Sequence, residues 1–420
     1  MTYHTRSPTP RLGRAVRRAL LPVAGLLAAA AAACGDDATP EAAVAVRDSA
    51  GVTIVENPGD VWAAPPAWTL AAEPRLQLGV ADGEEPYLFD GIRSLVPLSD
   101  GRFVVANSGD ATLRWYDATG TFLFQRGGHG GGPGEFNRLG NASPLGGDSI
   151  VAVDWSARRM TTFGPDGGLD RVASLAGLPG PPGTVYRLPD GSLITGVSGF
   201  SSTQLGERPE DGIVRIEEPL LRLSADGSRA DTLGMFPGME VDVQVSSERL
   251  LFGPARFGRS MNYSVHGNDV WVGTEEAFVI DAYGPDGVHR RSVRAPAIDV
   301  RVDDAFREAY FDFQRGRMAE LPEDRRQELE RALAETEFPA ARPAYSSVLT
   351  DARGNLWVGE YRIDLQPPER WLIFEPEGRL LGTLTLPPGV RILAVADDTL
   401  WGRATGDLGV EQVVAYTLER

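Results

Sequence analysis

The segment Gly354-Asn355-Leu356-Trp357-Val358 places a tight turn directly before a short run of residues that favour β-strands. The pattern occurs six times, and the first residue after each turn is 102, 149, 192, 269, 355 or 399. The other copies are Asp100-Gly101-Arg102-Phe103-Val104-Val105, Gly147-Asp148-Ser149-Ile150-Val151-Ala152, Asp190-Gly191-Ser192-Leu193-Ile194, Gly267-Asn268-Asp269-Val270-Trp271-Val272 and Asp397-Asp398-Thr399-Leu400-Trp401. A period near 45 residues with this strand content predicts a β-propeller.

Further strands follow each recurring segment. In the first unit, Leu113-Arg114-Trp115-Tyr116 and Phe122-Leu123-Phe124 flank a Thr119-Gly120 turn, which is a hairpin signal. Each unit is therefore expected to hold four antiparallel strands, but the sixth unit ends after its third. We expect Arg75-Leu76-Gln77-Leu78 to supply the missing strand. The prediction is an all-β, six-bladed propeller over residues 51–420, closed into a ring by this N-terminal strand.

One glycine-rich segment carries a family resemblance. Arg126-Gly127-Gly128-His129-Gly130-Gly131-Gly132-Pro133-Gly134-Glu135-Phe136 resembles the blade-linking signature of NHL-type six-bladed propellers. Together with Pro343-Ala344-Tyr345-Ser346-Ser347-Val348 and the segment at 354–358, it is similar to six-bladed propeller lipoproteins of environmental bacteria. The resemblance covers roughly residues 50–420 and implies a fold. It implies no activity, because propellers host hydrolases, lyases and binding proteins alike.

A helical insertion is predicted at residues 303–344. Phe306, Tyr310 and Phe313 recur at helical spacing after Asp303, a residue type that caps helix N-termini. Two interpretations are open: the apolar stripe packs on the rim of the propeller, or the insertion forms a lid over the axial channel.

The long segments are expected to leave the propeller from one face. They cover residues 127–137, 198–219, 237–261, 297–344 and 362–370, whereas the connections on the opposite face are short. We expect partners to bind the elaborated face, since loops commonly carry binding residues. The candidate contacts are of the aromatic and arginine types that dominate recognition surfaces: Arg126, Arg256, Arg259, Tyr263 and Tyr345.

No catalytic residue, cofactor or metal ligand is predicted. The Gly-x-Ser-x-Gly motif is absent, the glycine run around His129 matches neither a dinucleotide nor a Walker pattern, and the histidines lie far apart in the sequence. The alternative is a lactonase- or lyase-like propeller whose channel mouth holds a divalent cation. The inner strands would offer such an ion chiefly Asp90, Asn141 and Asn262, few ligands for calcium.

The charge of the chain narrows the choice of partners. The formal net charge is −17, and all 41 basic residues are arginine. A surface of this sign repels nucleic acid and anionic lipid headgroups. Nucleic acid is therefore not an expected partner.

The N-terminus has the pattern of an export signal. Arginines up to Arg18 precede 15 apolar residues, too few to span a bilayer, and small residues lead to Cys34, the only cysteine. This resembles a bacterial lipoprotein signal in which Cys34 receives the lipid, although Ala31 stands where Leu is more common. The alternative is an incidental cysteine after an ordinary signal peptide. We predict a signal peptide at 1–33, a flexible tether at 34–50 and an outer-membrane anchor facing the periplasm.

Two functions remain open at this point. The first is a lipid-anchored module that binds a peptide, a glycan or a partner protein on the elaborated face. The second is a metal-assisted hydrolase or lyase with its site at the mouth of the axial channel.

We expect Cys34→Ser to abolish lipidation and leave unprocessed precursor, because the thiol is the group that accepts the lipid. Metabolic labelling with a fatty acid checks this. Label retained by the variant would contradict the anchor assignment.

Overall fold

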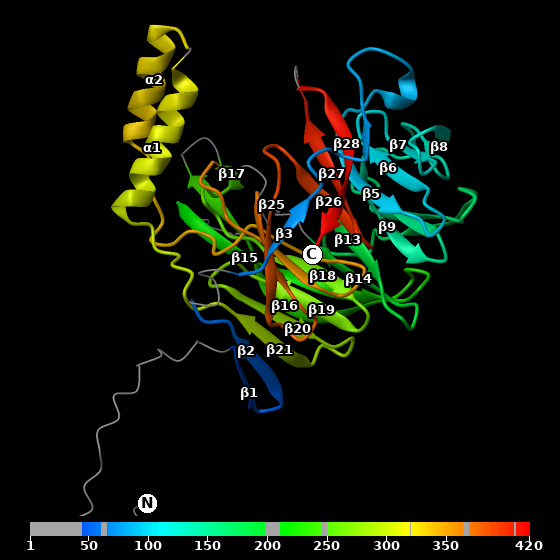
Figure 1. The fold of residues 1–420 in the computed structure, drawn as a ribbon, viewed down its shortest axis with the longest axis horizontal. Coiled ribbons are helices and arrows are strands. Elements are labelled where there is room, and N and C mark those ends of the chain that lie inside the picture. Colours follow the sequence, from blue (N-terminus) through cyan, green and yellow to red (C-terminus); the bar gives the residue numbers. More distant parts are fainter. Residues whose placement is uncertain are drawn as a thin grey trace, which may run out of the picture. The chain divides into compact units, whose positions relative to one another are not determined.

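The six recurring segments form six strands, each of them second in its own run of paired strands. They are β6 (Phe103–Asn107), β10 (Ser149–Asp154), β14 (Leu193–Val197), β19 (Asp269–Gly273), β23 (Leu356–Gly359) and β27 (Thr399–Thr405). The computed structural model describes residues 44–59, 65–197, 211–245, 250–319, 321–364, 369–406 and 409–420. The fold of these residues is all-β and propeller-like, with one helical insertion (Figure 1).

The turn before β23 explains the recurring motif. The Asp351 carboxylate accepts hydrogen bonds from the backbone N–H groups of Arg353 and Asn355, at 2.9 and 2.8 Å, and from the Trp357 indole N–H at 3.0 Å. Gly354 has φ +85°, a conformation that costs glycine little. Turn and strand therefore stabilise each other through one buried carboxylate.

Two sheets have four strands each. One contains β5 (Ile92–Pro97), β6, β7 (Thr112–Tyr116) and β8 (Phe122–Gly127). The other contains β9 (Leu139–Gly146), β10, β11 (Arg159–Phe163) and β12 (Leu169–Ser174). All their neighbouring strands are antiparallel.

Two further sheets are larger. One runs from β13 (Pro182–Arg187) through β14, β15 (Gly212–Leu223) and β16 (Ala230–Val245) to β17 (Leu250–Pro254). The other joins β18 (Asn262–His266), β19, β20 (Val279–Tyr283) and β21 (His289–Arg294) to β2 (Val52–Glu56) and β1 (Ala45–Ser49). The sequence analysis placed residues 212–219 and 237–254 in long loops, and this prediction was wrong. The cross-strand pairs continue from Leu223↔Ala230 to Gly212↔Val243, so the loop segments extend a hairpin.

The last two units share one nine-stranded sheet instead of forming two sheets of four. It contains β22 (Ser347–Thr350), β23, β24 (Arg370–Phe374), β25 (Leu380–Thr385), β26 (Arg391–Ala396), β27 and β28 (Glu411–Glu419). β3 (Ala67–Leu70) joins the two halves, because it pairs with both β25 and β28. β4 (Leu76–Leu78) pairs antiparallel with β28, which is the pairing expected for residues 75–78.

The first 43 residues lie outside the described part, and with them lie the predicted signal peptide and Cys34. β1 begins at Ala45, within the segment predicted as a tether. β2 then pairs in parallel with β21. The tether prediction was therefore wrong for residues 45–49, because the hairpin of β1 and β2 begins there.

The apolar core lies between neighbouring sheets. Trp115 of β7 contacts Phe163 of β11 with ring centroids 6.2 Å apart, and Phe103 of β6 contacts Trp401 of β27 at 4.8 Å. All four side chains are buried. Burying one such ring contributes roughly 1.5–3 kcal/mol, so these aromatic contacts hold the sheets together.

The insertion contains α1 (Asp304–Met318) and α2 (Glu323–Ala334), drawn beside each other in Figure 1. Asp303 caps α1 by accepting a hydrogen bond from the Phe306 N–H at 2.8 Å. Phe306 and Tyr310 pack on Phe257, with centroids 5.5 and 5.0 Å apart. The helix pair is therefore attached to the segment that follows β17.

Deleting residues 74–79 should lower the melting temperature by several degrees or more, because it removes β4 and leaves residues 413–415 on one edge of β28 unpaired. Deleting residues 35–43, ahead of β1, is the matched control and should change it little. Equal melting temperatures of the two deletions, measured by calorimetry, would show that β4 does not stabilise the sheet.

Candidate functional site: the axial cavity

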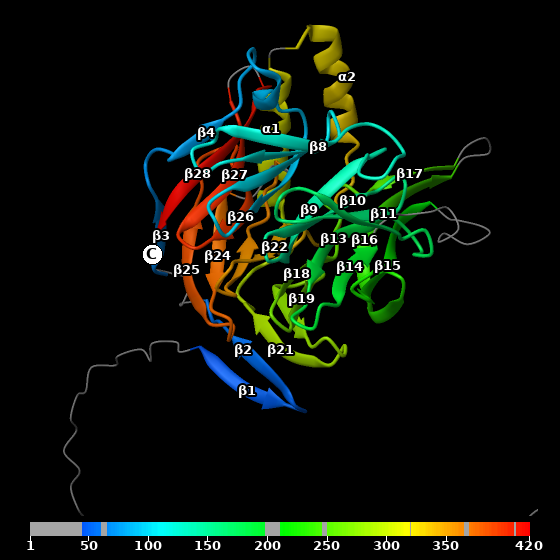
Figure 2. The ribbon, with the colours of Figure 1, turned by 90° about the vertical axis from the view of Figure 1, so that its right-hand side faces the viewer.

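One cavity of about 440 Å³ is lined by residues of six strands. These strands are β5, β9, β13, β18, β22 and β26, the first strand of each unit, and Figure 2 shows the last five gathered around one centre. We call this space the axial cavity. Its size lies in the range of small-molecule sites. Neither α1 nor α2 is among the described elements that line it, so the lid interpretation has no support in this arrangement.

Short polar side chains join the first strands on one side of the cavity. The Ala142 N–H of β9 donates to Ser94 Oγ of β5 at 2.8 Å. Asn141 Nδ2 donates to Thr184 Oγ1 of β13 at 2.7 Å, and the Tyr263 hydroxyl of β18 donates to the Thr184 carbonyl at 2.7 Å. These bonds link the first strands of four successive units, β5, β9, β13 and β18.

The links continue around the cavity. Ser264 Oγ of β18 and Thr350 Oγ1 of β22 lie 2.8 Å apart. The Ala352 N–H, just after β22, donates to the Val395 carbonyl of β26 at 3.2 Å. The wall is therefore held by hydrogen bonds between the first strands of different units.

A charged junction connects the end of the chain to β5. Glu411 of β28 accepts a hydrogen bond from the Ile92 N–H at 2.7 Å and forms an ion pair with Arg403 at 3.1 Å. Arg403 in turn lies 3.4 Å from the Ile92 carbonyl. The positive charge of Arg403 is thus balanced within the junction.

Arg93 and Arg391 line the cavity without a carboxylate partner. Neither forms an ion pair with any carboxylate in the described part of the chain, and both are exposed to the cavity. The one acidic lining residue, Asp351, is buried and bonds within its own turn. Burial and the guanidinium groups of Arg403 and Arg93 lower the pKa of Arg391. The cavity therefore presents net positive charge in an acidic protein.

Arg93 owes its position to an irregularity in β5. The cross-strand register shifts between Ile92 and Ser94, so Arg93 lies at a β-bulge. Bulges re-aim side chains and are frequent beside functional sites. Arg93 donates weakly to Ser108 Oγ, at 3.3 Å, and its guanidinium lies 5.2 Å from the centre of the Trp155 ring. Arg138 approaches the same ring at 5.6 Å.

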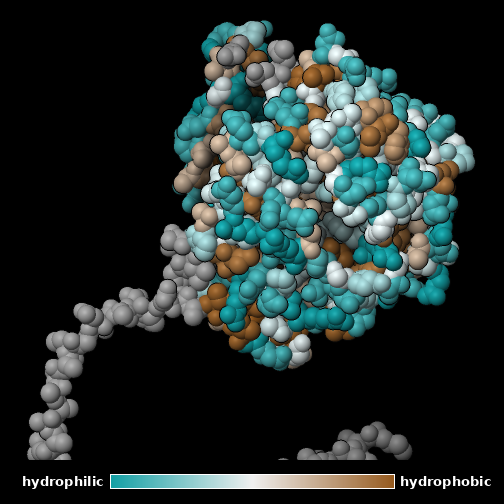
Figure 3. All heavy atoms as spheres, turned by 45° about the vertical axis from the view of Figure 1, so that its right-hand side comes forward, coloured by the Kyte–Doolittle hydropathy of each residue, from teal (hydrophilic) through white to brown (hydrophobic). Residues whose placement is uncertain are grey.

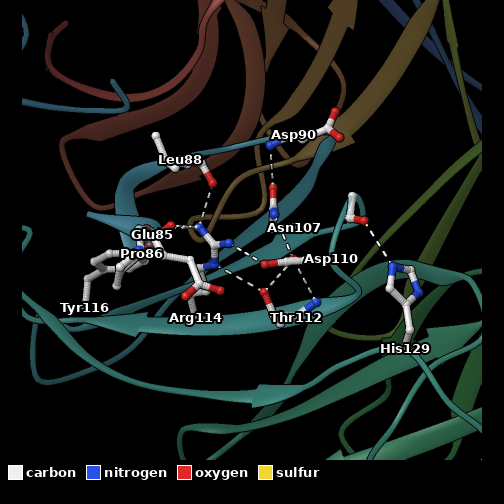
Figure 4. Close-up of polar contacts among 11 residues, drawn as sticks. Glu85, Pro86, Leu88, Asp90, Asn107, Asp110, Thr112, Arg114, Tyr116 and His129 are labelled. Carbon is white, nitrogen blue, oxygen red and sulfur yellow. Dashed lines mark hydrogen bonds and ion pairs between the residues drawn. The ribbon is translucent and has the colours of Figure 1, made fainter. Parts of the chain in front are cut away.

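The residues expected to offer a cation site do not converge. Asn141 lies in the cavity wall, but Asn262 donates to Glu275, and Asp90 is exposed and does not line the cavity. Figure 4 shows the Asp90 carboxylate pointing away from Asn107, which accepts a hydrogen bond from the Asp90 N–H. Among the described residues, no three His, Cys, Asp or Glu side chains gather as a metal site.

The three candidate arginine contacts lie in different places. Arg126 donates to the Gly167 carbonyl and lies over Phe124. Arg256 donates to the Tyr310 hydroxyl at 2.6 Å and so ties α1 to the sheets. Arg259 forms an ion pair with Glu240, and the Arg259 backbone N–H also donates to the Glu240 carboxylate.

The two candidate tyrosines are involved in packing and in hydrogen bonds within the chain. Tyr345 is fully buried, and its hydroxyl accepts a hydrogen bond from the Glu275 N–H at 3.1 Å. Tyr263 packs edge-on against Tyr186 and bonds Thr184. Of the five candidates, only Tyr263 reaches a residue that lines the axial cavity.

A second polar cluster surrounds the buried Arg114 of β7 (Figure 4). Its guanidinium donates to the carbonyls of Glu85, Pro86 and Leu88 at 2.8–3.1 Å and to the Asp110 carboxylate. The cluster fixes the 3₁₀ turn at Glu85–Tyr87 ahead of β5. Since its donors are used within the chain, we assign it a structural role.

Glu275 is a buried carboxylate in a strained position. Its φ of +63° is unusual for a residue other than glycine. The carboxylate accepts hydrogen bonds from the Ser260 N–H at 2.8 Å and from Asn262 Nδ2 at 2.5 Å. Burial raises the pKa of Glu275 to about 7, against these two hydrogen bonds, which lower it.

The surface drawn in Figure 3 is largely hydrophilic, with apolar patches among the polar residues. Within the described residues, no helix has the length and apolar character needed to cross a bilayer.

The sequence analysis missed Arg93, Arg138 and Trp155 as parts of one site. Arg391 was missed as well, because no motif marks its charge as unpaired. The signal that could have found it is an arginine at the beginning of two inner strands, Arg93 and Arg391, in a chain rich in acids.

No protein-family model matches the sequence, and no curated protein matches it either. Among solved structures, a member of the DUF4221 family from Bacteroides vulgatus aligns with a TM-score of 0.51 at 8% identity, over 84% of this chain and 98% of that one. Regucalcin, a calcium-binding protein from Agrobacterium tumefaciens, aligns with a TM-score of 0.44 at 11% identity, over 84% and 96%. Virginiamycin B lyase from Staphylococcus aureus aligns at 0.41 and 10% identity, over 82% and 98%. The first likeness supports the fold alone, and the other two are too distant to carry an argument.

The unfolding free energy should fall as the pH rises from about 5 to 8, because Glu275 loses its proton over this range. Its pKa is higher in the folded chain than the ordinary 4.5, so its contribution is complete below that value and lost as the pH passes about 7. The change is on the order of 1–3 kcal/mol. Denaturant unfolding across this range checks it, with Glu275→Gln expected to flatten the pH dependence.

Glu377→Gln, in an exposed turn, is the control and should keep the pH dependence of the parent. Identical pH profiles for the parent and Glu275→Gln would contradict the assignment.

Proposed function

We propose that the protein is an exported, lipid-anchored six-bladed propeller that binds a small anionic ligand in its axial cavity. The six units described above are then its blades, with β4 completing the last one. Cys34 would carry the anchor at the outer membrane, with the propeller facing the periplasm.

The observation that supports this function is the pair of arginines without carboxylate partners in the cavity wall. Arginine guanidinium groups match carboxylate and phosphate oxygens with two parallel hydrogen bonds. Two of them line one cavity, and its acidic residue Asp351 is already bonded in its own turn, which favours an anion there. The lining also includes apolar residues such as Leu95, Pro144 and Leu349, which suit the carbon skeleton of an organic ligand.

This proposal moves the binding site from the elaborated face to the cavity. Arg126, Arg256 and Arg259 bond within the chain, so a peptide, glycan or partner protein on that face would have to use other groups or displace these contacts. The metal-assisted hydrolase or lyase remains the competing function, and the experiment below includes calcium to separate the two.

We expect glutarate or inorganic phosphate to raise the melting temperature of the purified full chain in detergent. A ligand at a hundred times its dissociation constant stabilises a protein by about 2.7 kcal/mol. Arg391→Gln should remove most of this shift, because it deletes one of the two cavity charges. Arg229→Gln deletes an exposed arginine paired with Asp231 and should keep the shift.

The measurement is a thermal melt with each anion and, separately, with calcium. Absence of any anion-dependent shift in the parent protein would contradict the anion site. A calcium-dependent shift that a chelator reverses would instead favour the metal-dependent enzyme.

A further inference from the structure

Trp155 holds two arginines beside the axial cavity without neutralising them. The guanidinium carbons of Arg93 and Arg138 lie 5.2 and 5.6 Å from the centre of its ring. A cation placed over an indole face is attracted by the ring but keeps its full charge and most of its N–H donors. Trp155 therefore fixes the position of both groups and leaves them able to bind an anion.

Both arginines lack the partners that most arginines of this protein have. Across the described residues, ion pairs engage many arginines, yet neither Arg93 nor Arg138 pairs with a carboxylate. The Arg138 guanidinium lies over the Trp155 ring, and its backbone N–H, not its side chain, donates to the Asp154 carboxylate at 3.2 Å. Arg93 and Arg391 line the cavity, and Arg138 is connected to it through the Trp155 ring that it shares with Arg93.

Arg93 connects the cavity to the contact that Trp155 makes with Arg138. Arg93 lines the cavity together with Arg391 and contacts Trp155, and Arg138 reaches the same ring just before β9. Arg93 thus belongs to both the cavity and the Trp155 contact. Because both guanidinium carbons lie within 5.6 Å of one ring centre, they are at most about 11 Å apart, and an anion bound near both lowers the repulsion between these like charges.

We propose that the axial ligand carries two oxyanion groups, one bound by Arg391 and Arg93 inside the cavity and the second bound by Arg138 at its rim. This inference rests on the anion-binding function proposed above and specifies the class of ligand. Trp155 is a positioning residue, because it acts through the two arginines.

Two sources of such a ligand share this chemistry: a dicarboxylic acid and a compound with two linked phosphate groups. Guanidinium groups bind both in the same two-pronged way. Glutarate with butyrate, and pyrophosphate with inorganic phosphate, form matched pairs that differ in the number of anionic groups.

The experiment is isothermal titration calorimetry on the purified full chain in detergent, with each of the four compounds at one ionic strength. We expect the double anion of at least one pair to bind tenfold or more tightly than its single counterpart. The pair with the larger ratio identifies the source, and either result supports the inference. Equal affinity within both pairs would overturn it.

The variants separate this inference from the function on which it rests. Arg138→Gln should reduce the preference for the double anion to less than threefold and leave the affinity for butyrate and phosphate unchanged. Trp155→Leu should act in the same direction, and Trp155→Phe, which keeps an aromatic face, should retain most of the preference. Arg229→Gln is the control for the loss of one positive charge and should match the parent.

A preference that survives in Arg138→Gln would overturn the second binding group. In another outcome, the parent binds single anions, Arg391→Gln does not, and the parent shows no preference for double anions. This result would support the anion site and overturn only the inference. Failure of all four compounds to bind the parent would overturn both.

Discussion

The pairing of N-terminal strands with the end of the chain is the constraint on which the rest of the structure depends. β28 pairs with β27 on one edge, and β3 and β4 pair along the other, although more than 300 residues separate them in sequence. Without these partners, β28 would expose a row of unpaired backbone groups. The same strand carries Glu411, which bonds the Ile92 N–H at the start of β5. β28 therefore connects, through β27 and Glu411, two strands that line the axial cavity, β26 and β5.

The chemistry of the cavity follows from how its walls are joined. Serine, threonine and asparagine side chains form bonds between neighbouring sheets, and Asp351 is used inside its own turn. These groups are buried or half-buried, so their hydrogen bonds are needed to avoid unpaired polar atoms. The remaining charged groups of the wall are Arg93 and Arg391. These two arginines, which have no carboxylate partner among the described residues, are the basis of the proposed anion site.

The sequence predicted the repeated turn and strand because that signal is local. The Asp351 turn contains every partner it needs within seven residues, so its pattern can be read from the chain. β2 and β3 were missed because they are short and acquire their pairing from strands hundreds of residues away. The site was missed for a related reason. Arg93 lies where the register of β5 shifts between Ile92 and Ser94, and the periodicity of the sequence does not reveal such a shift.

An anion site inside an acidic protein is physically consistent because electrostatic interactions depend on distance. The net charge of −17 is spread over the whole chain, and at physiological ionic strength exposed charges are screened beyond about 8 Å. Arg93 and Arg391 would touch the proposed ligand directly, at a separation shorter than the screening length. The acidic surface then slows the approach of anions in general, whereas the cavity stabilises the one whose groups reach the arginines. In the proposed site, selectivity would arise from the position of the positive charges, against the repulsion of anions by the acidic surface.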